Sequence, residues 1–118
     1  MVMEDTLTYE EAKEIYSTIN DKLEWNDEDI VGLYHDMISR AVRYANIRAG
    51  WNALSREQKA AQDPSRTMAH DAFIMSVNIV ARSEGDVGTE WRKRLSDDRK
   101  RIGDFACYIA LFQGIEAR

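Results

Sequence analysis

Residues 30–45 read IVGLYHDMISRAVRYA, and their apolar side chains recur every three or four positions. This spacing places them along one side of an α-helix. The same spacing, with interruptions, runs from Ile15 to Ile109. The sequence therefore predicts an all-α protein: a compact bundle of four main helices plus a short connecting helix, in a single domain over residues 1–118.

Capping signals predict where the first two helices begin and end. Thr8, with Glu11 three residues later, predicts the start of the first helix. Asn26 or Asp27 precedes an acidic turn that suits the positive end of a helix dipole, and it predicts the start of the second. Gly50 is expected to end that helix.

The middle of the chain is expected to hold a short helix followed by a long one. Ser55 with Gln58 forms a capping-box pattern and predicts a connecting helix to about residue 62. Pro64, which needs no N–H in a first helical turn, predicts the start of a third main helix. That helix is expected to stop at Gly85.

The last main helix is expected between residues 89 and 113. Trp91 and Leu95 continue into the apolar face near Ile102. Asp98 interrupts this face and Gly103 lowers helix propensity, so a bend or break is expected near them.

Residues 72–81 read AFIMSVNIVA and are apolar on almost every side of the predicted helix. A helix of this kind lies at the centre of a bundle or is covered by another chain. A four-helix monomer has limited means to cover it on all sides. The sequence therefore predicts a homodimer that buries apolar surface.

Composition places the chain among ordinary globular proteins. Apolar residues make up 44% of its 118 residues and charged residues 31%. The single cysteine, Cys107, lies in an apolar segment and is interpreted as a packing residue. No apolar run is long enough to cross a membrane and no leader is apparent, so we expect a cytoplasmic protein without a membrane span or a cofactor.

The net charge of −5 hides an uneven distribution. Residues 1–29 carry ten acidic and two basic side chains, a net charge of −8, which leaves +3 for the remainder. A protein that is acidic overall is repelled by nucleic acid at long range, so a nucleic acid partner is not expected. The acidic first helix is a possible neighbour for basic residues of the same chain or of another subunit.

Two basic triplets follow each other in the predicted last helix. They are seven residues apart, nearly two helical turns, and are therefore expected to stack on one side of it. Such a strip is a candidate anion- or partner-binding site, with a solvated helix face as the favoured alternative. Its members are Arg92, Lys93, Arg94, Arg99, Lys100 and Arg101.

Both histidines are followed by aspartate and fall beside apolar stripes of predicted helices. The order His35, then His70-Asp71, then Asp104 resembles the HD family of metal-dependent phosphohydrolases. The resemblance implies an all-helical fold in which these four residues hold a divalent metal that activates water against a phosphate ester. Under the alternative, both histidines are structural residues at the edge of the core.

Between these interpretations, the sequence favours a protein without catalytic activity. We expect it to act through self-association or through binding to a protein partner. The metal-dependent phosphohydrolase is the alternative function, and it requires His35, His70, Asp71 and Asp104 to converge on one point.

Overall fold

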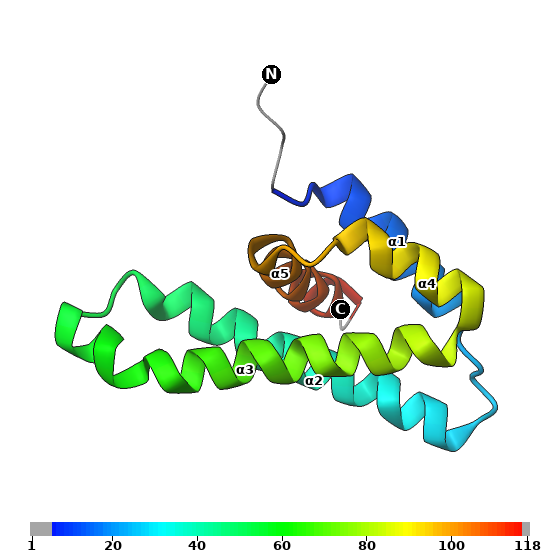
Figure 1. Ribbon diagram of the computed structural model, residues 1–118, viewed down its shortest axis with the longest axis horizontal. Coiled ribbons are helices and arrows are strands. Elements are labelled where there is room, and N and C mark those ends of the chain that lie inside the picture. The colour runs from blue at the N-terminus through cyan, green and yellow to red at the C-terminus, as the bar shows by residue number, and fades with distance from the viewer. Residues whose placement is uncertain (1–5, 117–118) are drawn as a thin grey trace.

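The computed structural model describes residues 6–116 and confirms the all-α prediction. The helices in this range pack into one bundle, and this part of the chain contains no β-strand (Figure 1). None of them is long and apolar enough to cross a membrane. The helices are α1 (Tyr9–Lys22), α2 (Glu28–Trp51), α3 (Arg56–Ser83), α4 (Gly85–Leu95) and α5 (Arg99–Glu116).

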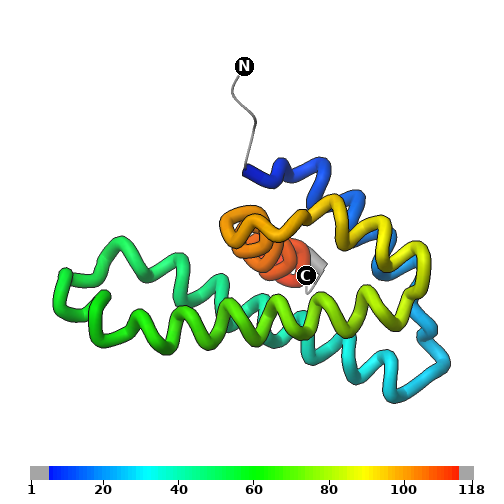
Figure 2. The backbone as a smooth tube through the Cα atoms, viewed as in Figure 1, coloured from blue at the N-terminus to red at the C-terminus, as the bar shows by residue number. Residues whose placement is uncertain are grey.

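The long helices α2 and α3 form an antiparallel hairpin that carries the rest of the fold (Figures 1 and 2). Helix α5 runs across the hairpin and is seen almost along its axis. Helices α1 and α4 lie side by side over α5. The end of the hairpin that contains the α2–α3 connection extends beyond the other helices.

Side-chain caps start the first three helices, as predicted. The Thr8 hydroxyl accepts a hydrogen bond from the Glu11 backbone N–H at 3.2 Å, and the Asp27 carboxylate accepts from the first turn of α2. The capping box of Ser55 and Gln58 is complete in both directions. These caps satisfy N–H groups that have no partner inside the helix.

The predicted division before Pro64 is wrong, because α3 runs without interruption from Arg56 to Ser83. A proline inside a helix removes one hydrogen bond, here to the carbonyl of Ala60. Ala60 and Pro64 are both exposed, so water can reach the carbonyl that is left. The cap at Ser55 and the packing of α3 on α2 hold the helix on either side of this point.

The predicted last helix is two helices. Helix α4 begins at Gly85, before the expected start, and ends at Leu95. Ser96 then adopts a positive φ of 56°, and Asp98 starts α5 by accepting hydrogen bonds from the next backbone N–H groups, at 2.8 and 3.0 Å. The break expected near Asp98 is confirmed, whereas α5 continues through Gly103.

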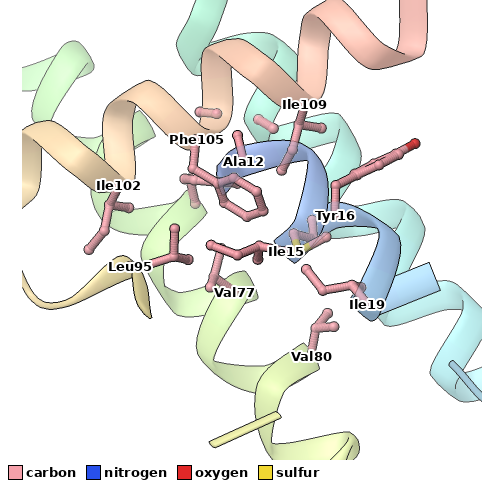
Figure 3. Packing of buried hydrophobic residues seen from close by; sticks show 14 of the residues in the cluster. Ala12, Ile15, Tyr16, Ile19, Val77, Val80, Leu95, Ile102, Phe105 and Ile109 are labelled. Carbon is pink, nitrogen blue, oxygen red and sulfur yellow. The ribbon is translucent and has the colours of Figure 1, made fainter. Parts of the chain in front are cut away.

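Each of the five helices contributes to one hydrophobic core. In Figure 3, Phe105 of α5 lies among Ile15 of α1, Val77 of α3 and Leu95 of α4, and all four side chains are buried. Met37 of α2 is also fully buried. Burying side chains of this size is the main favourable term in folding.

The sharp junction between α3 and α4 depends on glycine. Gly85 has a φ of +64°, a conformation that side chains other than glycine rarely adopt. Gly88 packs so closely on the end of α3 that an added Cβ would lie 1.7 Å from the backbone oxygen of Ala81. These two residues allow the chain to reverse direction within a few positions.

Glu84 sits at this junction with a partly unsatisfied carboxyl group. Its Oε1 accepts a hydrogen bond from the Trp91 indole N–H at 3.0 Å, while its Oε2 is buried without a hydrogen-bond partner in the described residues. Burial raises the pKa of Glu84 to about 7, although the Trp91 hydrogen bond opposes the shift. Glu84 therefore keeps its proton to a higher pH in the folded protein than in the unfolded chain.

We expect Glu84→Gln to stabilise the protein at pH 8 but not at pH 4. Since folding raises the pKa of Glu84 from 4.5 to about 7, its favourable contribution is complete below pH 4.5 and is lost as the pH rises to 7. The neutral amide avoids this loss, which is on the order of 1–2 kcal/mol after allowance for partial exposure. Urea unfolding across this pH range measures it. A difference between variant and wild type that does not change with pH would contradict the assignment.

Candidate functional site

The six basic residues do not form the single helical strip that their spacing predicted. Arg92, Lys93 and Arg94 belong to α4, whereas Arg99, Lys100 and Arg101 belong to α5. The prediction of stacking on one helix is wrong, because the turn at Ser96 changes the direction of the chain between the two triplets. The two triplets therefore lie on different helices and contact different parts of the protein.

Two of these arginines connect the acidic first helix to α4 and to the start of α5. Arg94 pairs with Glu14 at 2.8 Å, and Arg101 pairs with Glu11 at 3.0 Å. Arg101 also donates to the Arg94 backbone carbonyl. The sequence left open whether the acidic first helix meets the basic residues within one chain or between subunits, and these ion pairs form within one chain.

Arg92 holds the turn between α4 and α5. Its guanidinium donates to the Asn78 side chain and to the Ser96 backbone carbonyl, both at 2.6 Å. It also forms an ion pair with Asp97 at 3.3 Å. Arg92 therefore joins α3, α4 and the turn, whereas its neighbour Lys93 is exposed.

The four candidate metal ligands are not brought together. Among the side chains that the structure describes, in residues 6–114, no group of three or more histidines, cysteines, aspartates or glutamates is placed to hold a metal ion. His35 is exposed, and its ring contacts that of Tyr34. His70, on α3, is buried against Tyr44 of α2. Tyr44 lies nine residues after His35 on α2, which is about 13 Å along the helix axis.

The other two candidate ligands form ion pairs. Asp71 accepts from Arg99 at 3.2 Å, and Asp104 accepts from Arg48 at 2.8 Å. The Asp104 carboxylate also lies 3.4 Å from Lys100. The order of residues in the chain resembles the HD family, but the geometry of the fold does not reproduce its site.

Cys107 is not set up as a nucleophile. The thiol is half-buried on α5, and burial raises its pKa, although the nearby Arg48 opposes this. A raised pKa leaves little thiolate at neutral pH. This agrees with the interpretation of Cys107 as a packing residue.

A basic cavity of about 250 Å³ lies where α2, α3 and α5 meet. Its wall contains Arg48 from α2, Arg66 from α3, and Arg99 with Lys100 from α5, together with the His70 ring. Sequence reasoning identified Arg99 and Lys100 but missed the two arginines. No local pattern marks them, because tertiary packing brings their side chains together from three helices.

The outward side of α3 carries an apolar strip that consists of Met68, Ala72, Met75 and Ile79. Their spacing of four, three and four residues aligns them on one side of the helix. Met68 is 72% exposed and Met75 is 60% exposed, while Ala72 and Ile79 are half-buried. The opposite side of α3 packs into the core through Phe73, Val77 and Val80.

Comparison with known proteins gives no match to a family model, to a characterised protein or to a solved structure. Function is therefore inferred from the geometry of the chain itself.

Proposed function

We propose that this protein is a non-catalytic helical protein of the cytoplasm that acts by self-association through the apolar strip of α3. The observation that supports this most directly is the exposure of Met68 and Met75 on a helix whose opposite side packs into the core. Neighbouring apolar side chains at alternating spacings of three and four residues are typical of a seam between two helices. Covering them with a second copy removes apolar surface from water.

The strip suits an antiparallel pairing with a two-fold axis near Ala72. Such an interface uses the same surface of both copies. Met68 of one copy then lies near Met75 of the other, and the small side chain of Ala72 allows the two backbones to approach.

A charge placed on the strip is expected to prevent self-association. Wild-type protein should scatter light with a mass about twice the 13.6 kDa of one chain, whereas Met68→Glu and Met75→Glu should each give a monomer. A buried glutamate without a partner opposes assembly strongly. Both positions are exposed in the monomer, so helix content measured by circular dichroism should not change.

The matched control is Leu111→Glu. Leu111 is an apolar side chain on α5 that is 48% exposed and lies outside the strip. This variant should remain a dimer. A wild-type protein that is monomeric at high micromolar concentration, or an equal loss of dimer in all three variants, would refute the proposed interface.

A further inference from the structure

We propose that the basic cavity between α2, α3 and α5 binds a small phosphate-type oxyanion. Four cationic side chains line it: Arg48, Arg66, Arg99 and Lys100. Two carboxylates pair with three of these cations. Asp104 forms ion pairs with Arg48 and Lys100, and Asp71 forms one with Arg99. The cluster therefore keeps an excess of about two positive charges, which a dianion would balance.

Arg66 is the cation without a carboxylate partner among the described ion pairs. Its guanidinium lies 4.6 Å from the centre of the Trp51 ring, and its Nε is buried with no hydrogen-bond partner. A stacked guanidinium keeps its planar fork of N–H donors, which matches the oxygens of a phosphate group. A bound oxyanion would supply the missing acceptor.

His70 provides a second unsatisfied atom at the same cavity. The side chain is 4% exposed, and its Nε2 lies 3.0 Å from the Arg99 backbone carbonyl. Because a carbonyl only accepts hydrogen bonds, Nε2 must carry the hydrogen. Nδ1 is buried without a hydrogen-bond partner, and the nearest Asp71 oxygen is 3.9 Å away. With the hydrogen on Nε2, Nδ1 is an acceptor that a P–OH group of a hydrogen phosphate can satisfy, whereas the Arg66 Nε–H donates to an unprotonated phosphate oxygen. Because buried polar atoms are normally satisfied, these two atoms of residues that line the cavity support a ligand of this kind.

The size of the cavity limits the ligand. At about 250 Å³ it is smaller than most pockets for small organic molecules. It has room for inorganic phosphate or for the phosphate group of a small ester. Thr67 in the wall adds a hydroxyl group that can donate to an oxyanion. This site contains no residue of the apolar strip, so either proposal can fail without the other.

Binding is tested by calorimetry with inorganic phosphate, with sulfate and with methyl phosphate, each against chloride at equal ionic strength. We expect saturable binding of the dianions and none of chloride. Inorganic phosphate binding more tightly than methyl phosphate would indicate a free ion as the ligand, and the reverse order would indicate a phosphomonoester. Absence of binding by all three dianions at low salt would overturn the proposal.

Variants locate the site. Arg66→Gln should weaken phosphate binding about tenfold or more, since a hydrogen bond to a charged group is lost. Lys93→Gln, which removes an exposed cation outside the cavity, should leave the affinity unchanged. Asp71→Asn should strengthen binding severalfold, because it frees Arg99 from its carboxylate. Equal weakening by Arg66→Gln and Lys93→Gln would show general charge attraction and would overturn the assignment to the cavity.

The two histidines give a readout that does not depend on any substitution. His70 lies in the cavity wall, whereas His35 is exposed on α2 and is absent from that wall. Ring resonances of His70 should shift as sulfate is added, while those of His35 stay in place. Shifts of equal size in both rings, or in His35 alone, would contradict binding in the cavity.

Discussion

Replacing Gly88 by alanine is expected to destabilise the protein by about 3 kcal/mol, the upper end of the usual cost of overpacking. The added Cβ would lie 1.7 Å from the oxygen of Ala81 and 2.6 Å from its carbonyl carbon. Both atoms belong to the backbone of α3, so they cannot move aside as a flexible side chain would. The start of α4 must shift, and Trp91 and Leu95, which are both buried, must shift with it. Urea unfolding measures the loss.

The control for this prediction is Gly32→Ala. Gly32 lies inside α2, is exposed, and has no atom within 4 Å of an added Cβ. Because alanine favours the helix over glycine, this variant should gain about 0.5–1 kcal/mol. If Gly88→Ala were also neutral or stabilising, the close approach of α4 to α3 would be incorrect.

Removing the carboxylate of Asp104 is expected to cost roughly 2 kcal/mol, between the loss of a surface ion pair and the loss of a fully buried one. The side chain is 13% exposed and pairs with Arg48 and Lys100. It also accepts a hydrogen bond from the Leu7 backbone N–H at 3.3 Å. Asp104→Ala therefore leaves several donors without an acceptor and weakens the contact of α5 with both α2 and the N-terminal segment.

Asp36→Ala is the matched control for Asp104→Ala. Asp36 pairs with Arg40 one turn further along α2, and its side chain is 50% exposed. Surface pairs of this kind contribute about 0.5 kcal/mol or less. Thermal unfolding at low salt measures the loss of stability in each variant. Similar losses of stability in the two would contradict the role of Asp104 as an acceptor for several donors.

The parts of the fold that depend on local signals were predictable from the sequence. The caps at Thr8, Asp27 and Ser55 act on backbone groups within one turn, and each is where the sequence placed it. Pro64 misled because the cap at Ser55 and the packing of α3 on α2 hold the helix on either side of it, while water can reach the carbonyl of Ala60. The turn after α4 was expected near Asp98, but the positive φ of Ser96 has no signature in the sequence.

The sites were less predictable because they are formed by tertiary contacts. The exposed strip of α3 has a sequence signal, since residues 72–81 are apolar on nearly every side. The basic cavity has none, because Arg48, Arg66 and Arg99 come from three different helices and are brought together only by the packing of those helices. The equal spacing of the two basic triplets suggested one surface, although Arg94 and Arg101 are used within the chain to bind Glu14 and Glu11.

Cross-linking at Ala72 tests the proposed self-association most directly. In a Cys107→Ser background, Ala72→Cys places a thiol next to the two-fold axis of the antiparallel pair. Mild oxidation should then convert most of the protein into a covalent dimer, whereas Leu111→Cys in the same background should give little. A monomeric Ala72→Cys product, or equal cross-linking at both positions, would contradict the claim that two copies associate through α3.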